Sequence, residues 1–239
     1  MKDLVKIILI LFLLSGCSYN TGNYIKNIGC PDGEIEWINA VMINDIKFEN
    51  NYFPNPADEP IPLVMEKGNE IGKVTYRMAG SACSNHRMKN GDATFLEEGT
   101  PIFEIKGYPP SFVVLADNEP FVVSQNKYAK KASELLPLDS LVKNIYFESL
   151  EDGSRIHTIS QDSKDKFINS WYELQLEDVE GLFNEGKLEG TRVFLEFELN
   201  NGITFRMLYW ADSNTFHSGV IGNDEIKDII DDELSKVIY

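Results

Sequence analysis

The sequence predicts an α+β protein, in which a small β-rich domain, barrel-like or sandwich-like, precedes an α+β domain with an antiparallel hairpin and two helices. Short apolar runs separated by turn residues fill residues 30–127, a pattern typical of small barrels and sandwiches. Apolar and polar residues alternate on both sides of Asn201-Gly202, which predicts the hairpin. Two later stretches repeat apolar residues at helical spacing.

The chain begins with a segment typical of a secretion signal. Lys2 supplies a positive end, and Ile7 to Leu14 form an apolar core. Eight apolar residues are too few to span about 30 Å of bilayer hydrocarbon as a stable helix. We therefore predict that residues 1–16 form a signal peptide that is removed from the mature chain.

The junction Leu14-Ser15-Gly16-Cys17 resembles the lipobox of bacterial lipoproteins. The resemblance implies a diacylglyceryl thioether on Cys17 and cleavage of the chain in front of this residue. Two acyl chains anchor a protein stably, because each buried methylene contributes about 0.8 kcal/mol. Residues 17–29 are mostly polar and form the predicted tether. An ordinary cleaved signal with an incidental cysteine is the alternative interpretation.

Residues 30–127 contain the strands of the predicted β-rich domain. The first strand runs from Ile35 to Ile43 and ends at Asn44-Asp45. Four prolines between Asn50 and Pro62 predict an exposed loop, because proline fixes φ and lacks an N–H donor. Further strands are expected at Ile71–Met78, Pro101–Ile105, Ser111–Leu115 and Phe121–Ser124, the last two joined by a turn at residues 117–120.

A mostly polar stretch at residues 128–141 is the predicted boundary, so the second domain covers residues 142–239. It begins with a strand at Val142–Ser149, and Asp162 is the expected N-cap of a helix. The hairpin covers Arg192–Trp210. We predict a type I′ turn at its tip, because an Asn-Gly pair tolerates positive φ.

A final helix is predicted after Asn223, a residue favoured at the N-cap. Asp224 and Glu225 follow it and complement the positive end of the helix dipole. The apolar residues expected inside are Ile226, Ile229, Ile230, Leu234 and Val237. The acidic residues expected on the solvated outer face are Asp228, Asp231, Asp232 and Glu233.

The composition limits the classes of partner. The chain carries 38 acidic and 22 basic residues and a formal net charge of −16. The predicted signal peptide carries +1, so the mature chain carries −17. Such a surface repels phosphate backbones and anionic headgroups, which argues against binding nucleic acid or lying flat on anionic lipid. A hydrophobic share of 43% with 14 Phe and 10 Tyr indicates a folded body.

If Cys17 is lipidated, Cys30 and Cys83 are the remaining cysteines. An even number in an oxidising compartment predicts a disulfide, which would stabilise the fold by about 4 kcal/mol in the chain-entropy model. Two independent thiols remain an equal alternative. No CxxC or HxxxH spacing accompanies these cysteines, so we predict neither a metal site nor a cofactor.

The sequence assigns no catalytic residue. Nucleophilic catalysis needs a Ser or Cys beside a base. His86, His157 and His217 accompany no GxSxG turn and are expected at or near the surface. Ser163 and Lys166 have SxxK spacing, but the SDN and KTG elements that act with it are missing. Acidic residues are so frequent that no carboxylate pair stands out for glycoside hydrolysis.

Three blocks of the first domain, Glu36–Ile46, Lys89–Phe103 and Ile105–Tyr108, resemble uncharacterised lipobox-containing lipoproteins of Bacillus-like Gram-positive bacteria. The resemblance implies a lipid-anchored protein on the extracytoplasmic face of the cell membrane. It implies no catalytic residue.

We expect a non-catalytic binding or interaction module at the cell envelope, held on the bilayer through acylated Cys17 and contacting an envelope protein or a small ligand. The alternatives are an envelope hydrolase that acts on cell-wall material and a sensor or regulatory partner of a membrane protein. Aromatic residues beside rigid turns form a candidate platform for sugars or peptides, with core packing as the other explanation. They are Tyr52-Phe53, Tyr108-Pro109-Pro110 and Trp210.

The lipobox predicts the behaviour of a Cys17→Ala variant. Without the thiol no thioether forms, so the variant should keep its signal peptide and incorporate no radiolabelled palmitate. A Ser18→Ala variant, changed one residue later, should be processed and labelled normally. Normal labelling of the Cys17→Ala protein would refute the anchor.

Overall fold

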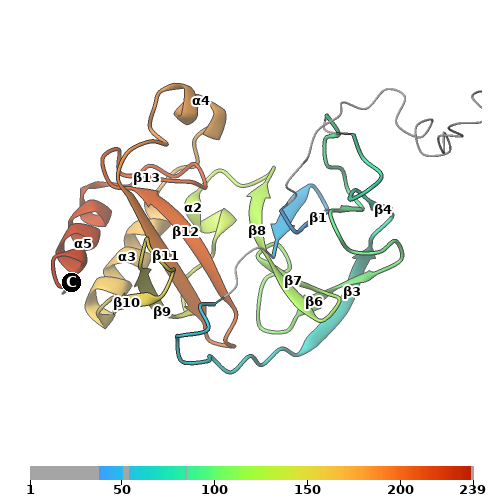
Figure 1. Ribbon diagram of the computed structural model, residues 1–239, viewed down its shortest axis with the longest axis horizontal. Coiled ribbons are helices and arrows are strands. Elements are labelled where there is room, and N and C mark those ends of the chain that lie inside the picture. Colours follow the sequence, from blue (N-terminus) through green and yellow to red (C-terminus); the bar gives the residue numbers. More distant parts are fainter. Residues whose placement is uncertain (1–37, 51–53, 84, 238–239) are drawn as a thin grey trace, which may run out of the picture. The chain divides into compact units, whose positions relative to one another are not determined.

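Two β-sheets organise the described part of the chain, which comprises residues 38–50, 54–83 and 85–237 of a computed structural model (Figure 1). All strands and helices named below belong to one compact unit. The fold is α+β and mostly β, as predicted. Within the described ranges, no helix has the length and apolar composition needed to cross a bilayer.

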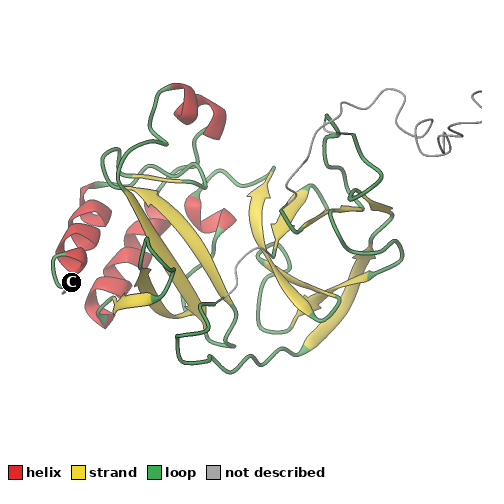
Figure 2. Ribbon diagram, viewed as in Figure 1, coloured by secondary structure: helices red, strands yellow, loops and turns green. Residues whose placement is uncertain are grey.

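The first sheet is a curled, mixed sheet, drawn in yellow on the right of Figure 2. It has eight strands in the order β3-β6-β7-β8-β2-β1-β5-β4. Its pairs are antiparallel except for β4 and β5, which run parallel. The strands are β1 (Ala40–Ile43), β2 (Ile46–Glu49), β3 (Lys67–Lys73), β4 (Tyr76–Arg77), β5 (Asp92–Ala93), β6 (Pro101–Ile105), β7 (Val113–Ala116) and β8 (Glu119–Asn126).

Two hairpins of this sheet turn on pairs of residues with positive φ. Asn44 and Asp45, with φ of 53° and 60°, join β1 to β2. Asp117 and Asn118, with φ of 49° and 62°, join β7 to β8. Positive φ at both central residues defines a type I′ turn, whose twist matches that of paired strands, and Asn and Asp tolerate this region. The turns expected at both places are confirmed.

The second sheet is antiparallel throughout, in the order β10-β9-β11-β12-β13. The predicted hairpin is confirmed as β11 and β12, whose residues pair without a break from Arg192↔Trp210 to Glu198↔Thr204. The strands are β9 (Val142–Glu148), β10 (Arg155–Thr158), β11 (Arg192–Leu199), β12 (Thr204–Trp210) and β13 (Thr215–Phe216). The helices are α2 (Ala132–Leu135), α3 (Gln161–Glu173), α4 (Val179–Asn184) and α5 (Asp224–Leu234).

The tip of this hairpin differs from the predicted type I′ turn. The Leu199 N–H donates to the Ile203 carbonyl at 2.8 Å, so the loop has three residues instead of two. The Gly202 N–H donates to the Leu199 carbonyl at 2.9 Å, and Gly202 is the loop residue with positive φ, 86°. The type I′ prediction was wrong because Asn200 belongs to the loop, which makes a three-residue turn with glycine in the left-handed position.

The start of α3 also differs from the prediction. Ser160 is the N-cap, and its side chain accepts a hydrogen bond from the Ser163 N–H at 3.3 Å. The predicted cap, Asp162, lies in the first turn and pairs with Lys166 at 2.7 Å. Because Ser160 already satisfies a free N–H at the helix start, the carboxylate of Asp162 complements the helix dipole instead.

Apolar side chains of both sheets and of α3 form one buried cluster. The ring of Phe205 on β12 lies 5.9 Å from that of Phe112, which precedes β7. On the same face of the hairpin, the ring centre of Phe197 lies 5.9 Å from that of Phe167 on α3. Full burial contributes roughly 1.5–3 kcal/mol for each side chain of this size. The odd-numbered face of the hairpin therefore packs against both α3 and the first sheet. The division into two domains stays a prediction.

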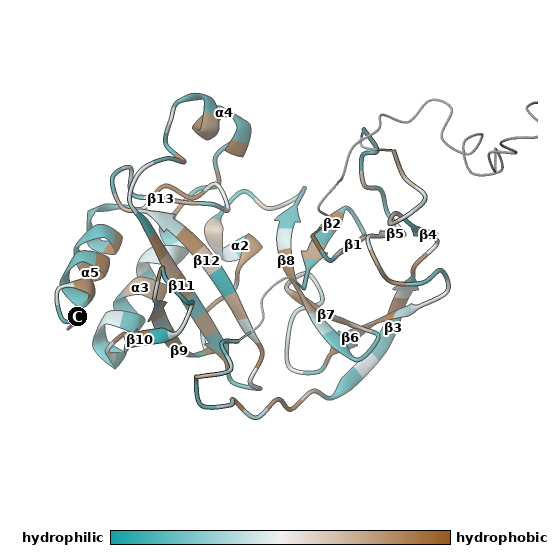
Figure 3. Ribbon diagram, viewed as in Figure 1, coloured by the Kyte–Doolittle hydropathy of each residue, from teal (hydrophilic) through white to brown (hydrophobic). Residues whose placement is uncertain are grey.

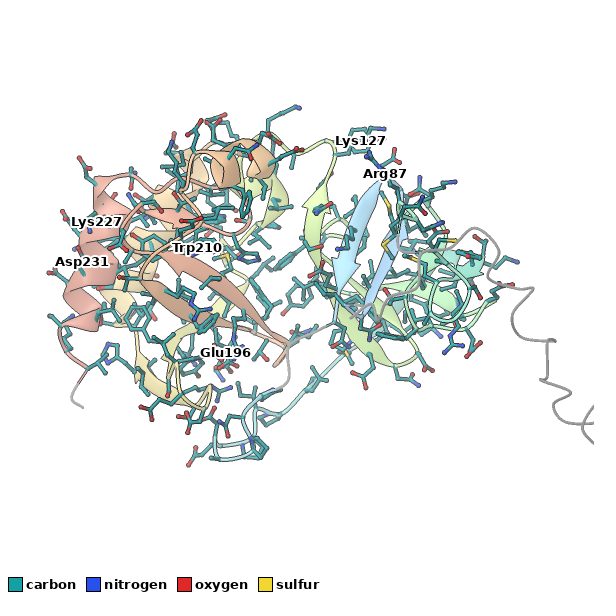
Figure 4. The ribbon with its side chains drawn as sticks, turned by 45° about the horizontal axis from the view of Figure 1, so that its top comes forward. Arg87, Lys127, Glu196, Trp210, Lys227 and Asp231 are labelled. Atoms are coloured by element: carbon teal, nitrogen blue, oxygen red, sulfur yellow. The ribbon has the colours of Figure 1, made fainter. Side chains whose placement is uncertain are left out.

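Helix α5 confirms the predicted cap and core face. The Asn223 side chain accepts from the Ile226 N–H at 3.0 Å, and the three predicted isoleucines Ile226, Ile229 and Ile230 are buried. Figure 3 shows hydrophobic and hydrophilic residues alternating along this helix. On the outer face, Lys227 and Asp231 form an ion pair of 2.8 Å (Figure 4).

Glu233 is the exception on α5. We predicted it on the solvated face, but the residue is only 1% exposed. Glu233 lies four residues after Ile229 and three after Ile230, so helical geometry places it on the same buried stripe. The prediction was wrong because it followed residue type and not the helical period.

Gly202 provides a test of the hairpin tip. A Cβ at this position would collide with the Pro62 carbonyl, and φ is 86°. Gly107 has a similar φ of 87° with no atom within 4 Å of a built Cβ. Gly107→Ala should therefore lose about 1 kcal/mol of unfolding free energy for the left-handed conformation alone. Gly202→Ala should lose roughly 3 kcal/mol, because the collision adds to that cost.

Urea denaturation of the two variants measures this difference directly. Equal losses for Gly202→Ala and Gly107→Ala would contradict the close approach of Pro62 to the tip of the hairpin.

Candidate functional site

A pocket of about 460 Å³ opens between the two sheets. This volume lies within the range typical of small-molecule sites, and such sites usually combine apolar walls with a few polar groups. The pocket is lined by residues from segments far apart in the sequence: 49–50, 54–63, 119–124, 135–136, 202–207 and 217–218.

The inner wall of the pocket is apolar. Residues of β8, of the segment after α2 and of the β12 end of the hairpin supply it: Val122, Val123, Leu136, Ile203, Phe205 and Met207. Each of these is at most 8% exposed, so they belong equally to the core. A ligand in the pocket would therefore contact the packed interior and not a mobile surface.

The proline-rich segment 54–63 forms another wall. It is the loop predicted from its prolines, and it is held against the second sheet at defined points. The Asn55 side chain donates to the Asp152 carbonyl at 2.6 Å. The backbone N–H of Arg155 donates to the Asp58 carboxylate at 3.1 Å, and the Arg155 guanidinium donates to the Glu59 carbonyl at 3.4 Å. Proline restricts φ, so this wall loses little entropy when it is held in place.

Arg155 is itself held by a buried carboxylate. Its Nε and Nη2 donate to the two oxygens of Glu196 at 2.6 and 2.7 Å, and Glu196 on β11 is fully buried (Figure 4). The guanidinium also lies 4.5 Å from the centre of the Tyr146 ring. A bidentate pair of this kind combines charge with defined geometry. The Arg155–Glu196 pair therefore fixes the position of the proline-rich wall.

Two further buried carboxylates lie on the same face of the sheet. Glu148 accepts from the guanidinium of Arg206, a pocket residue, at 2.5 and 3.0 Å. Glu198 accepts from Lys143 at 2.7 Å and from the Tyr146 hydroxyl at 2.5 Å. Burial opposes ionisation, but these hydrogen bonds hold the pKa of Glu198 below its ordinary value. Burial, together with the hydrogen bond to Glu198, raises the pKa of Tyr146 to about 12.

His217 is one of the polar residues that line the pocket. The backbone N–H of Leu208 donates to the ring nitrogen Nδ1 of His217 at 3.1 Å. The backbone N–H of His217 in turn donates to the Leu208 carbonyl at 2.9 Å. A backbone N–H can only donate, so Nδ1 is unprotonated and the proton of the neutral ring is on Nε2. Desolvation by the surrounding protein lowers the pKa of His217, which keeps the ring neutral at pH 7. Within the described ranges, Nε2 has no hydrogen-bond partner.

Ser218 adds a hydroxyl without a partner. Its Oγ is buried and makes no hydrogen bond among the described residues, although buried hydroxyls are normally paired. The following residue, Gly219, has a φ of 91°, and a Cβ there would lie 2.7 Å from the Glu177 carbonyl. This turn therefore requires glycine, and it holds His217 and Ser218 at the pocket.

Tyr108 and Trp210, two of the aromatic residues singled out in the sequence, do not line this pocket. The Tyr108 hydroxyl accepts a hydrogen bond from the Asn201 N–H at 3.1 Å, and the Tyr108 side chain packs against the core. Trp210 lies at the end of β12 (Figure 4), and neither Tyr108 nor Trp210 lines the pocket. Tyr52-Phe53 lie outside the described residues.

The predicted cysteine sites are only partly described. Cys83 is disulfide-bonded. Cys17 and Cys30 lie outside the described residues, so the lipid attachment and the Cys30–Cys83 pairing stay predictions.

A second polar cluster surrounds Glu233. His157 Nε2 lies 2.7 Å from Glu233 Oε2. The hydroxyls of Ser160 and Ser163 donate to Oε1 at 2.7 and 2.5 Å, and Lys236 Nζ lies 2.9 Å from the same oxygen. Burial would raise the pKa of Glu233, but these hydrogen bonds dominate and hold the pKa far below its ordinary value.

This cluster contains the residue types of a catalytic triad in the wrong order. In a Ser-His-acid triad the imidazole lies between the hydroxyl and the carboxylate and takes the hydroxyl proton. Here the Glu233 carboxylate lies between His157 and the two serines, so both serines donate to an acid that is already ionised. The cluster ties α5 to β10 and to the start of α3 and leaves neither serine activated.

Sequence reasoning missed His217 and Ser218 as site residues. A His-Ser-Gly sequence after a short strand indicates a turn, but nothing in it shows which segments face the turn.

The described residues contain no group of three or more His, Cys, Asp or Glu able to hold a metal ion.

No protein-family model, curated protein or solved structure matches the chain. The fold and the site on their own define a mixed α+β protein with a ligand-sized pocket between two sheets.

The Glu233 cluster predicts a pH-dependent contribution to stability. A carboxyl whose pKa is lowered by folding stabilises the protein above its ordinary pKa of 4.5, and this stabilisation is lost as the pH falls through the folded value. At pH 7, Glu233→Gln should lose about 3 kcal/mol of unfolding free energy. Below pH 4.5 the difference from the native protein should shrink.

Urea titrations at several pH values measure this difference. Asp232→Asn, the exposed neighbour, is the control and should unfold like the native protein throughout. A Glu233→Gln deficit that stays constant down to pH 2 would contradict the ionised, hydrogen-bonded carboxylate.

Proposed function

We propose that the protein is a lipid-anchored, extracytoplasmic binding module that holds a small ligand in the pocket between its sheets without transforming it. The anchor rests on the signal segment and the lipobox resemblance. The binding role rests on one observation: the pocket is ligand-sized, its inner wall is apolar, and the imidazole of His217 lines it with an Nε2–H that has no hydrogen-bond partner among the described residues.

The tautomer of His217 favours binding over hydrolysis. A general base needs a free lone pair directed at the proton that it removes. The lone pair of His217 is on Nδ1 and is engaged by the Leu208 N–H, whereas Nε2 carries a proton. The imidazole can therefore donate a hydrogen bond to a ligand oxygen, but it cannot activate Ser218 or a water molecule from that position.

Two carboxylates of the pocket lining are already engaged by other groups of the protein. Asp58 accepts from the Arg155 N–H at 3.1 Å, and Glu49 pairs with Lys47 at 2.6 Å. A pair of acidic groups for glycoside hydrolysis needs one carboxyl with a raised pKa and a second that stays ionised. Asp58 and Glu49 are both already engaged by groups of the protein, which supports a structural role for them.

Matched substitutions at the rim test the binding role. Leu63 lines the pocket, whereas its neighbour Val64 does not, and the two are 48% and 70% exposed. Leu63→Trp should fill the pocket, and Val64→Trp should leave it open. The probe is hexan-1-ol, whose oxygen can accept from His217 Nε2–H while its chain contacts the apolar wall.

The measurement uses the full-length chain on lipid nanodiscs with ¹⁵N-labelled histidine. Hexan-1-ol should shift the His217 ring resonances in the native protein and in Val64→Trp, with at least tenfold weaker binding in Leu63→Trp. Identical titrations for the native and Leu63→Trp proteins would show that the pocket is not the binding site.

A further inference from the structure

We propose that the pocket selects an organic cation: a short apolar body that carries an ammonium group at one end and a hydroxyl or carbonyl oxygen at the other. This deepens the proposed function and rests on it. It follows from the charges at the pocket wall, from the neutrality of His217 and from the apolar surface between them.

The charges that line the pocket are predominantly negative. Its carboxylates are those of Glu49, Asp58, Glu59 and Glu119, and its guanidinium is that of Arg206. The positive charge of Arg206 is compensated by Glu148, whose oxygens lie 2.5 and 3.0 Å from its nitrogens. The negative charge of Glu49 is compensated by Lys47 at 2.6 Å.

The other three carboxylates form no salt bridge with a side chain of the described residues, although the Arg155 guanidinium is close enough to Asp58 for their charges to interact. Asp58 accepts from a backbone N–H, and Glu119 accepts from the Asn50 amide at 3.4 Å. The Glu59 backbone is held by Arg155, while its exposed side chain makes no hydrogen bond or ion pair within the described ranges. Three such charges around a cleft with apolar walls focus a negative potential into it. An ammonium group would be attracted there, and a carboxylate would be repelled.

No protonated imidazole offsets this potential. Desolvation lowers the pKa of His217, so the ring enters the balance as a neutral donor. Its Nε2–H requires a ligand oxygen, because an ammonium nitrogen has no lone pair to offer. The ligand thus needs two polar ends of different kinds.

The surface between these ends is hydrophobic. Val122 of β8 faces the pocket together with Phe205 and Met207 of β12, which favours methylene groups over further polar atoms. Sugars carry hydroxyls all around the ring, and several of these would find no hydrogen-bond partner at this wall. An amino alcohol or a peptide amino terminus beside an apolar side chain carries all three features.

Three compounds of equal chain length separate the contributions: 6-aminohexan-1-ol, hexan-1-ol and 6-hydroxyhexanoate. We would titrate each into the full-length chain on nanodiscs of zwitterionic lipid and follow the His217 ring resonances at low salt. The amino alcohol should bind at least tenfold more tightly than the hydroxy acid, with hexan-1-ol between them. Raising the salt should reduce this ratio, because exposed charges are screened over about 10 Å at 0.1 M.

Charge-neutralising variants locate the effect. Glu59→Gln and Glu119→Gln should each weaken binding of the amino alcohol several-fold and leave hexan-1-ol unchanged. Asp228→Asn removes the same charge from the exposed face of α5, away from the pocket lining, and should leave both affinities unchanged.

The outcomes distinguish this inference from the function on which it rests. If hexan-1-ol binds and the amino alcohol binds no more tightly than the hydroxy acid, selection of a cation is wrong, while the binding role stands. If Asp228→Asn weakens binding of the amino alcohol as much as Glu59→Gln does, the cation is attracted by the overall charge of the protein and is not selected by the pocket. If none of the three compounds shifts His217, both proposals fail.

Discussion

Arg155 on β10 connects three parts of this structure: β11, β9 and the proline-rich segment 54–63. The Arg155 guanidinium donates to both oxygens of buried Glu196, stacks over the Tyr146 ring and donates to the Glu59 carbonyl. The backbone N–H of Arg155 donates to the Asp58 carboxylate. Removing one partner of a buried pair leaves an uncompensated charge, which costs about 3–5 kcal/mol. The same residue thus supports the β10–β9–β11 part of the sheet and the position of the proline-rich wall.

The hairpin β11–β12 shows how one element serves two environments. Its odd-numbered residues, such as Phe197 and Phe205, pack into the common core. Its even-numbered residues include Glu196, Glu198 and Arg206, each joined to a charged side chain of another strand of the same sheet. Paired charges can be buried where isolated ones cannot. This allows a sheet with one polar face to be covered by a loop and to border a pocket.

The sequence predicted those features that depend on neighbouring residues. Alternation over Arg192–Trp210 was enough for the hairpin, and Asn44-Asp45 for the break after β1. The turn at Gly202 was assigned to the wrong type because the loop length depends on where strand pairing ends. Glu233 was placed outside because its residue type was given more weight than its position on the helix.

The pocket could not be predicted in this way. It exists only where the segment around Pro60 meets β12 and β8, and no local pattern specifies that meeting. The chemistry of His217 also depends on strand pairing, because a backbone N–H of the adjacent strand, that of Leu208, selects its tautomer. The sequence shows a histidine and a serine, while the fold decides that one donates and the other lacks a partner.

The walls of the pocket come from segments that are distant in the chain, and this has a consequence for cooperativity. A molecule bound there would contact β8 of one sheet and β12 of the other at the same time. Its binding free energy would then be lost whenever either sheet opened. Hydrogen exchange of backbone amides would therefore slow in both sheets when the ligand binds. Occupancy of one pocket would stabilise the whole described body against local opening.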